Sequence, residues 1–368
     1  MELSYTVQII LYILGILIFS ILINGILLKF SSNLGQRKIE NQVRWSSTNK
    51  PAFGGISFYI IFLISSVLAL FMSYNKPGNM IGISTIGFFA ATSAGFLMGL
   101  ADDSYNTKPF LKFSVQFICG IILVLTDNNI EFFSNQYLNA ALTIFWVVGL
   151  MNSLNMLDNM DAITSSIAAV IASGALLFML SQRLEYTFDF IMILGTFTAF
   201  VGFLYYNWNP SRMYMGDSGS QFVGMFLAWI GIKYFWNATD NFGNEIDGKQ
   251  FLVPLLVFAV PIADTTTVFI NRLRKGKSPF VGGKDHTTHH LYYLGLSNRQ
   301  VAIVLISISV ACMLAAIIGI NSIINWDWNH FILFGVLFLI VVVGLYSTSL
   351  ISKPEKNDQK DISSNKTA

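Results

Sequence analysis

Eleven long apolar runs, separated by short polar stretches, follow one another along almost the whole chain. About 20 apolar residues in helical conformation cross the hydrocarbon core of a bilayer, and most of these runs reach that length. The pattern predicts an all-α polytopic integral membrane protein with about eleven transmembrane helices. The expected helices cover 7–29, 54–74, 80–100, 111–127, 137–155, 162–181, 188–206, 219–237, 250–270, 299–320 and 329–351.

The composition agrees with a membrane protein. Of the 368 residues, 54% are apolar and 11% are charged, whereas a soluble domain carries about 25% charged residues. The first apolar run has no basic residues before it and no A-x-A cleavage pattern, so a retained helix is expected. We expect residues 1–351 to form a single transmembrane domain and the polar segment 352–368 to be a disordered cytoplasmic tail. Cys119 and Cys312 lie inside apolar runs and suggest no disulfide framework.

Basic residues are distributed unequally between the two sets of loops. With eleven spans, the loops after odd-numbered helices and the C-terminal tail share one side, and 18 of the 22 Lys and Arg residues lie there. Loops rich in Lys and Arg stay in the cytoplasm. The N-terminus is therefore expected outside and the C-terminus in the cytoplasm. The excess of basic residues reflects topology and gives no indication of nucleic-acid binding.

Polar side chains gather in five segments, all on the expected cytoplasmic side. We expect them to meet in one site at that end of a helical bundle, because polar residues kept beside apolar spans usually serve a site, a pathway or a helix contact. The segments are "NKPAFGG" (49–55), "LADDSYNTKPFLK" (100–112), "NSLNMLDNMDAI" (152–163), "YNWNPSRMYMGDSGS" (206–220) and "PIADTTTVFINRLRKGKSPFVGGKDHTTHH" (261–290).

Two of these segments offer carboxylates and amides at regular spacing. Asp102 and Asp103 are adjacent, and like charges so close raise at least one pKa unless a cation such as Mg²⁺ relieves them. A solvated loop pair beside Lys112 is the structural alternative. Asn155 and Asp158 continue a three-residue repeat that falls on one broad helix face; with Asp161 they suit a base, a ribose or a sugar. Interhelical hydrogen bonding is the alternative for these residues.

The sequence "GDSGS" at 216–220 suggests a metal ligand near phosphate. It lacks the final glycine of a hydrolase G-x-S-x-G elbow, and no G-K-[ST] follows as in a P-loop. What remains is Asp217 in a glycine-flanked loop that opens an apolar run. There it could bind a metal beside backbone N–H groups that hold phosphate oxygens.

The last polar segment carries an acid near the cytoplasmic end of the ninth expected span and three of the four histidines. Asp264 fits a helix-capping or ion-pair role as well as a direct role in catalysis. His286, His289 and His290 lie among Arg and Lys residues with no cysteine nearby. This setting favours anion binding over a zinc site, with a structural cluster as the third option. Together the five segments indicate phosphoryl chemistry between a soluble nucleotide-type donor and a lipid acceptor.

In this order the motifs resemble the polyprenyl-phosphate N-acetylhexosamine-1-phosphate transferases, the family that includes phospho-N-acetylmuramoyl-pentapeptide transferase. The resemblance runs from about Lys50 to His290 through "KPAFGG", "DD" with a downstream Lys, "NSLNMLDNMD", "NWNPSRMYMGDSGS" and "SPF…DHTTHH". It implies transfer of a sugar 1-phosphate from a UDP-N-acetylhexosamine to undecaprenyl phosphate, with release of UMP. The H-x-x-H-H pattern resembles the N-acetylglucosamine-1-phosphate branch, because pentapeptide transferases carry three consecutive histidines.

The resemblance also implies roles for individual residues. Asp102 and Asp103 match the catalytic aspartate pair, with Asp102 acting on the lipid phosphate and Asp103 assisting. Asp217 matches the ligand of Mg²⁺, with Mn²⁺ as the alternative ion. The substrate-binding positions implied by the resemblance are Lys50, Lys112, Asn155, Asp158, Asp161, His286, His289 and His290.

The resemblance further implies a setting for the protein. The expected location is the bacterial inner membrane, multi-pass, with the active site facing the cytoplasm. The expected partners are undecaprenyl phosphate, a UDP-N-acetylhexosamine and the lipid bilayer, with a homodimer as a further option and no nucleic acid.

Two positions in one segment depart from the family pattern. Where the family reads D-G-x-D-G, this chain has "DNMDA", with Asn159 and Ala162 in place of both glycines. Asparagine tolerates a left-handed backbone, whereas alanine is expected not to, so a differently angled loop is predicted.

Two alternatives stay open beside this reading. The nearer one is a phospho-N-acetylmuramoyl-pentapeptide transferase, which the histidine pattern disfavours. The one from another class is an ion-coupled transporter, whose acids would lie near the bilayer midplane and whose halves would often be inverted repeats. The acids here lie at span ends on one side, and the chain shows no internal repeat.

Overall fold

The computed structural model describes residues 4–33, 50–73, 81–239, 249–276, 278, 283–323 and 326–352. These residues form helices and connecting turns, with no strand element among them. The helices are α1 (Tyr5–Asn33), α2 (Gly54–Ser73), α3 (Ile83–Tyr105), α4 (Pro109–Leu125), α5 (Gln136–Leu157), α6 (Ile163–Ser181), α7 (Phe188–Asn207), α8 (Gly216–Gly231), η1 (Ile232–Trp236), α9 (Lys249–Val257), α10 (Ala259–Arg274), α11 (Thr287–Tyr293), α12 (Asn298–Ser322) and α13 (Trp328–Ile351).

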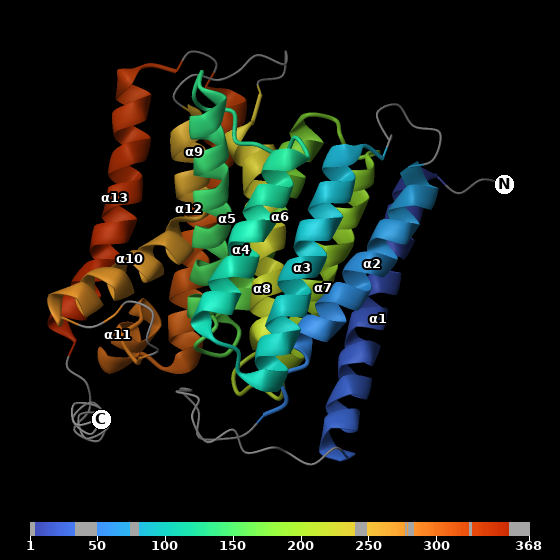
Figure 1. The fold of residues 1–368 in the computed structure, drawn as a ribbon, viewed down its shortest axis with the longest axis horizontal. Helices are drawn as coiled ribbons and strands as arrows, with labels where there is room; N and C mark the ends of the chain where they lie inside the picture. Colours follow the sequence, from blue (N-terminus) through green and yellow to red (C-terminus); the bar gives the residue numbers. More distant parts are fainter. Residues whose placement is uncertain are drawn as a thin grey trace.

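A helix occurs at each of the eleven predicted runs, which confirms the all-α polytopic fold. Eight of the described helices are long and apolar enough to cross a membrane alone. The helix α4 is shorter, with 17 residues, and α8 has 16 residues continued by the π-helix η1. Most helices run side by side along one direction, with α1 beginning at the upper end of Figure 1 and α13 ending at the lower end.

The ninth predicted span is broken. The helices α9 and α10 meet at an angle of 78°, so 250–270 is not one straight helix. Pro254 lies inside α9; its ring removes one backbone donor and weakens the helix ahead of the break. Beyond the break, α10 leaves the direction of the bundle and lies obliquely beside α11 (Figure 1). This bend places the end of α10 next to the histidine segment, which a straight span would not do.

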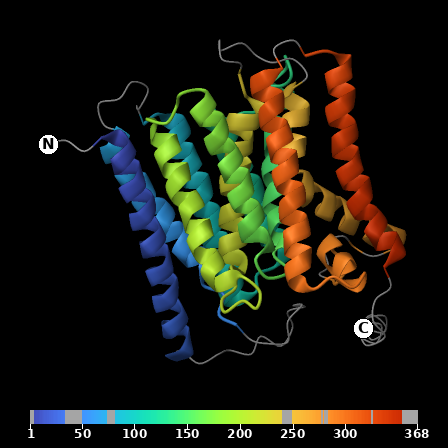
Figure 2. The same ribbon diagram turned by 180° about the vertical axis from the view of Figure 1, so that it is seen from behind.

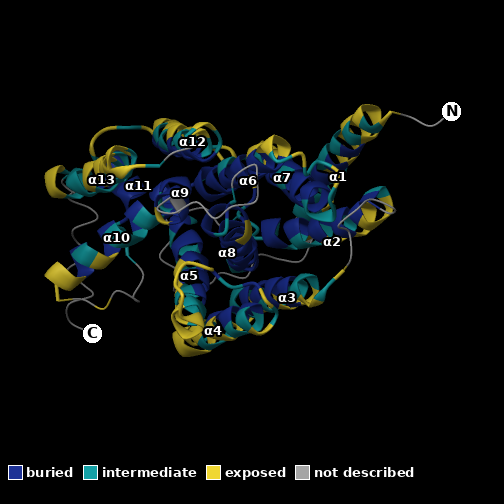
Figure 3. Ribbon diagram, turned by 90° about the horizontal axis from the view of Figure 1, so that it is seen from above, coloured by how far each residue is buried: buried dark blue, intermediate teal, exposed yellow. Residues whose placement is uncertain are grey.

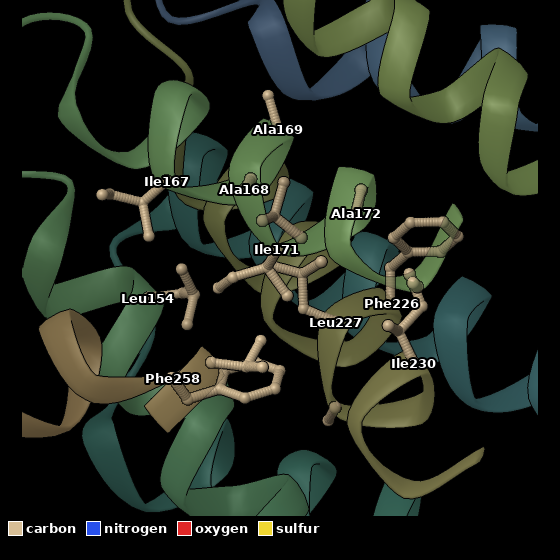
Figure 4. Packing of buried hydrophobic residues seen from close by; sticks show 14 of the residues in the cluster. Leu154, Ile167, Ala168, Ala169, Ile171, Ala172, Phe226, Leu227, Ile230 and Phe258 are labelled. Atoms are coloured by element: carbon tan, nitrogen blue, oxygen red, sulfur yellow. The ribbon is translucent and has the colours of Figure 1, made fainter. Parts of the chain in front are cut away.

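The helix α8 occupies the centre of the bundle. Every residue of α8 except Asp217 is buried, and seen from above it is surrounded by α2, α3, α5, α6 and α7 (Figure 3). Its apolar side chains, Phe226 and Leu227 among them, pack against residues of α6 such as Ile171 (Figure 4). A helix that is apolar all round belongs in such a position. The end of α8 that carries Asp217 is thereby fixed by packing on several sides.

The outer helices expose apolar faces. On α1, Ile10, Leu14, Ile18, Leu22 and Ile26 are between half and two-thirds exposed, and their spacing of four residues puts them on one side of the helix. The helix α13 shows a similar apolar face and stands at the edge of the bundle in Figure 2. Faces of this extent would be unfavourable in water, so lipid covers them in a multi-pass membrane protein.

Two glycines allow the start of α8 to approach its neighbours closely. A Cβ atom at Gly99 of α3 would lie 2.2 Å from the Asp217 carbonyl oxygen, and one at Gly55 of α2 would lie 2.1 Å from the Gly219 nitrogen. Both contacts are with backbone, which cannot rotate away as a side chain can. The backbones of α2, α3 and α8 therefore meet at the end of the bundle where the polar segments lie.

We expect Gly99→Ala to lower the free energy of unfolding by about 1–3 kcal/mol, because the added methyl group overpacks the contact with α8. The matched control is Gly149→Ala in α5, where an added Cβ meets nothing within 4 Å. There the same change should be neutral or stabilise by up to about 1 kcal/mol, since alanine is the better helix former. Thermal unfolding in detergent measures both, and equal shifts in the two variants would contradict the proposed contact.

Candidate active site

A lysine lies between two carboxylates at the end of the bundle where α3 stops and α8 starts. The Lys112 Nζ atom donates to Asp102 Oδ2 at 2.8 Å and to Asp217 Oδ1 at 2.9 Å. It also donates to Asn155 Oδ1 at 3.2 Å. These side chains come from α3, α4, α5 and α8, and the three that form the ion pairs are between 12% and 22% exposed. Partly desolvated charges of opposite sign attract more strongly than on an open surface.

Asn155 completes this cluster. Its Nδ2 group donates to Asp217 Oδ1 at 2.5 Å and to Ser220 Oγ at 2.8 Å, while its Oδ1 accepts from Lys112. The amide therefore lies with its oxygen toward the lysine and its nitrogen toward α8. Ser220 belongs to the "GDSGS" motif but was not predicted as a site residue.

The adjacent acids Asp102 and Asp103 have different surroundings. Asp102 accepts from Lys112 and from both the backbone N–H and the hydroxyl of Thr107. Asp103 accepts from the backbone N–H groups of Asp217 and Ser218, each at 2.8 Å. It thus binds the N-terminus of α8, where the helix dipole favours a negative charge. The structure gives Asp103 a direct role in positioning Asp217, and its assistance in catalysis stays a prediction.

Lys50 and Asp161 form a second polar group on the same side. Asp161 accepts from the Ser211 hydroxyl at 2.7 Å, from the Ser211 backbone N–H at 3.0 Å and from the Asn209 side chain at 2.9 Å. Lys50 Nζ donates to Ser211 Oγ at 3.0 Å and lies 3.9 Å from Asp161. The sequence did not single out Ser211, although it lies inside the fourth polar segment.

Ala162 adopts the left-handed backbone conformation, which alanine was expected not to adopt. Its φ is 67° and its ψ is −10°, so the expectation was wrong. The conformation costs about 1–2 kcal/mol for a residue with a Cβ atom. It is held by the buried Asn207, whose Oδ1 accepts from the Ala162 backbone N–H at 3.0 Å and from the Ser165 hydroxyl at 2.9 Å. The loop therefore keeps the backbone turn that glycine would give.

Asp264 binds the start of the histidine segment. It is fully buried and contacts His286 Nδ1 at 2.9 Å. It also accepts from the Thr287 backbone N–H at 2.7 Å and from the Thr287 hydroxyl at 2.5 Å. Of the roles considered for Asp264, the structure therefore shows the ion-pair and capping one.

A second contact holds the same segment to α10. Arg272 Nε and one terminal nitrogen bind the two oxygens of Asp285 at 2.9 Å and 2.7 Å, a bidentate pair. Sequence reasoning missed this pair, because nothing local relates the two positions. In addition, the Thr288 hydroxyl donates to Asn159 Oδ1 at 2.6 Å, which joins the histidine segment to the loop after α5.

The remaining predicted positions lie at the same end. Asp158 is the C-cap residue of α5 and is half-buried. His289 and His290 are buried in α11, and His290 Nδ1 is 2.7 Å from the Ser352 hydroxyl. Of the predicted motif "SPF", Pro279 and Phe280 lie outside the described residues, as do residues 353–368 of the predicted tail.

The oxygen atoms gathered here are of the type that binds a divalent cation. Lys112 is surrounded by the oxygens of Asp102, Asp217 and Asn155, and oxygen is the ligand that Mg²⁺ prefers. Within the described ranges no three His, Cys, Asp or Glu side chains form a group that could hold a metal. Mg²⁺ commonly takes one or two protein carboxylates and completes its shell with water and substrate phosphates. Asp217 and Asp102 fit that arrangement.

The comparisons with known proteins agree with this geometry. Residues 85–235 match the family model of glycosyl transferase family 4. The match covers less than half of the chain. The matched residues contain Asp102, Lys112, Asn155 and Asp217, so the whole lysine–carboxylate cluster lies within the similarity. The resemblance drawn from the motifs is confirmed.

Three relatives show how far the similarity extends. A Bacillus subtilis protein named "Probable undecaprenyl-phosphate N-acetylglucosaminyl 1-phosphate transferase" is 26% identical over 95% of this chain and 94% of its own. The undecaprenyl-phosphate alpha-N-acetylglucosaminyl 1-phosphate transferase of Escherichia coli K12 is 24% identical over 80% of this chain and 78% of its own. The phospho-N-acetylmuramoyl-pentapeptide-transferase of Staphylococcus carnosus is 28% identical over 62% of this chain and 75% of its own.

The histidine segment should make stability depend on pH. Burial lowers the pKa of His289 well below its ordinary value, and the charge of His286 lowers it further. Burial and the charge of Lys275 likewise lower the pKa of His290. A histidine whose folded pKa is lowered is protonated more easily in the unfolded state. The free energy of unfolding is therefore unaffected by this group above the unfolded pKa of about 6.5 and decreases as the pH falls below it.

Asp285 acts in the same direction at lower pH. Burial raises its pKa, but the hydrogen bonds and charge of Arg272 lower it more, and the net pKa lies below the ordinary value. Its contribution is complete above about pH 4 and is lost below. We expect the Tm in detergent to fall as the pH decreases from 8 to 5, with a shallower fall in His290→Gln. An equal slope in that variant would exclude His290 as a source.

Proposed function

We propose that the protein transfers N-acetylglucosamine 1-phosphate from UDP-N-acetylglucosamine to undecaprenyl phosphate. An oxygen of the lipid phosphate attacks the β-phosphorus of the donor, the bond between that phosphorus and the α–β bridging oxygen breaks, and UMP leaves. The observation that carries the proposal is the cluster of Asp102, Lys112 and Asp217 inside the family domain. The names of the Bacillus and Escherichia relatives support the same reaction.

Lys112 is suited to phosphate binding in this reaction. Its ammonium group already has two carboxylate partners, and both phosphate substrates carry negative charge that a fixed cation can stabilise. When a substrate enters, the phosphate oxygens can replace one carboxylate while the other keeps the lysine in place. Lys112 thereby orients the reacting phosphates and stabilises charge that develops on them.

Asp102 is suited to positioning the lipid phosphate. Thr107 and Lys112 fix its side chain by hydrogen bonds, so its direction is set before the substrate arrives. A phosphate monoester is largely ionised near neutral pH, with a second pKa of about 6, so positioning contributes more than proton removal. Asp102 can still accept the remaining proton when the lipid phosphate binds as the monoanion.

Two acids and one lysine leave the cluster with an excess negative charge before any substrate binds. We propose that Asp217, with Asp102, holds Mg²⁺ or Mn²⁺ here. Such an ion supplies charge neutralisation on the diphosphate and on the leaving UMP. Asp103 fixes the backbone that carries Asp217, and Asn155 fixes the carboxylate itself.

The same end of the bundle is proposed to face the cytoplasm of a bacterium. The loops and tail on that side carry 18 of the 22 basic residues, and UDP-sugars are soluble cytoplasmic donors. Lys50, Asp161 and the histidine segment then lie where the nucleotide and the diphosphate approach. The product would begin a lipid-linked glycan of the cell surface.

We expect purified protein with undecaprenyl phosphate and Mg²⁺ to release UMP from UDP-N-acetylglucosamine. UDP-N-acetylgalactosamine and UDP-N-acetylmuramoyl-pentapeptide serve as comparison donors, and a reaction without a divalent cation as control. Release only from the pentapeptide donor would assign the chain to the other branch, to which the Staphylococcus relative belongs. No release from any UDP-N-acetylhexosamine would overturn the proposal.

We expect Asp102→Asn and Lys112→Gln each to lower kcat by about 10²–10⁴-fold, because each removes a fixed charge that acts on the reacting phosphates. The matched control is Lys29→Gln, which removes one positive charge from an exposed position near the end of α1 and should leave kcat unchanged. The UMP-release assay measures all three. Retained kcat in Lys112→Gln would remove the lysine from the mechanism.

A further inference from the structure

A second polar site lies at the opposite end of the bundle, far from the lysine–carboxylate cluster along the helices. It is a pocket of about 340 Å³ between the starts of α3 and α7, the end of α6 and the π-helix η1. Pockets for small ligands begin at about this size. The resemblance and the proposed transfer reaction assign nothing to this end of the molecule.

An ion pair lines the pocket. Lys233 Nζ lies 2.5 Å from Asp189 Oδ2, and the Tyr234 hydroxyl donates to the same oxygen at 2.8 Å. The Lys233 side chain is 45% exposed, whereas that of Asp189 is 17% exposed and Tyr234 is buried. The carboxylate is therefore fixed, and the lysine is free to exchange it for another partner. Because water reaches the lysine, the pair contributes little beyond the roughly 1 kcal/mol of a surface ion pair, so exchange costs little.

The π-helix brings the two partners of Asp189 together. Lys233 and Tyr234 are consecutive in η1, and both line the pocket. A single turn of π-helix inside an α-helix widens the turn and often occurs at functional sites. Here it follows the buried helix α8 directly, and Lys233 also lies 5.2 Å from the centre of the Trp229 ring.

The remaining lining is half apolar. Ile81 and Phe188 contribute apolar surface, with Ile81 55% exposed, while Ser84 and Thr85 bring hydroxyl groups. A fully water-soluble ligand would gain nothing from the apolar part. A ligand with a polar head and apolar chains matches both parts, and such ligands surround the end of a membrane-spanning bundle.

The charges of the pocket select the head group. The charges of Asp189 and Lys233 sum to zero. The fixed carboxylate would therefore repel an anionic head group, and the lysine would repel a purely cationic one. A head group with one ammonium and one phosphate can pair with both. A primary ammonium can also donate hydrogen bonds to Asp189, which a quaternary ammonium cannot do.

We propose that this pocket binds the head group of a zwitterionic phospholipid that carries a primary amine. The ammonium group pairs with Asp189, and the phosphodiester pairs with Lys233 and the hydroxyls of Ser84 and Thr85. The acyl chains leave past Ile81 and Phe188 into the bilayer. The lipid thereby joins α3, α6, α7 and η1 at this end of the bundle and stabilises it.

The test uses the full-length protein, in detergent, mixed with phosphatidylethanolamine, phosphatidylcholine and phosphatidylglycerol that share the same acyl chains. Native mass spectrometry counts the retained lipid, and thermal unfolding reports stability. We expect retention of phosphatidylethanolamine to exceed that of the other two by about tenfold, the effect of one hydrogen-bonded charge pair. Equal retention of all three by the wild-type protein would overturn the proposal.

Variants separate recognition from a structural role. Lys233→Gln should lower the retention of all three lipids, because they share the phosphodiester that Lys233 binds, whereas Arg183→Gln, which removes an exposed positive charge at the same end, should leave retention unchanged. Asp189→Asn leaves Lys233 without its carboxylate and should change the preference to phosphatidylglycerol, a change that loss of stability alone would not produce. Unchanged retention in Lys233→Gln, together with an unchanged preference in Asp189→Asn, would contradict the site.

Soluble glycerophosphoethanolamine distinguishes a lipid from a free head group. If the apolar lining contributes as proposed, a large excess of this compound leaves the bound lipid in place. Displacement of the lipid at an equal concentration would overturn the assignment to a lipid.

Discussion

The Lys112 ammonium group, held among the oxygens of Asp102, Asp217 and Asn155, is the contact on which the arrangement of the site depends. A charge that is partly withdrawn from water must be paired, because an unpaired one costs several kcal/mol. Four helices contribute to this pairing, so their ends must meet at one point in the bundle. One negative charge remains unbalanced, and a phosphate-bound cation would neutralise it. The same carboxylates that pair with Lys112 thus also supply the charge that the proposed reaction needs.

Close backbone packing makes this pairing possible. Gly99 and Gly55 let α3 and α2 reach the first turn of α8, and Asp103 then binds the two N–H groups that begin it. The two adjacent acids therefore have different partners: Asp102 binds Lys112, and Asp103 binds the N-terminus of α8. The position of Asp217 is fixed by packing, because it lies at the start of α8, whose other residues are all buried.

The two ends of the bundle carry charge in different ways. At the end with the proposed transfer site, carboxylates outnumber the lysine and the histidine segment is held by buried contacts to α10. At the opposite end a balanced, half-exposed pair lines a pocket beside a π-helix. The break between α9 and α10 belongs to the first end, since it turns α10 toward the histidine segment. These contrasts separate a site that acts on phosphates from one that would hold a lipid in place.

Local composition was enough to predict the apolar helices and the gathering of polar segments at one end of the bundle, because helix formation and membrane insertion depend on it. The sequence was also enough to predict the family resemblance, since the motifs keep their order along the chain. Tertiary packing, in contrast, places Lys112 between Asp102 and Asp217, sets Asp103 against α8 and brings Asp264 to His286. The partners in such pairs are up to 115 residues apart, and no local pattern relates them. Ala162 shows the same limit, because its left-handed backbone is held by Asn207 from another helix, a contact that propensity does not contain.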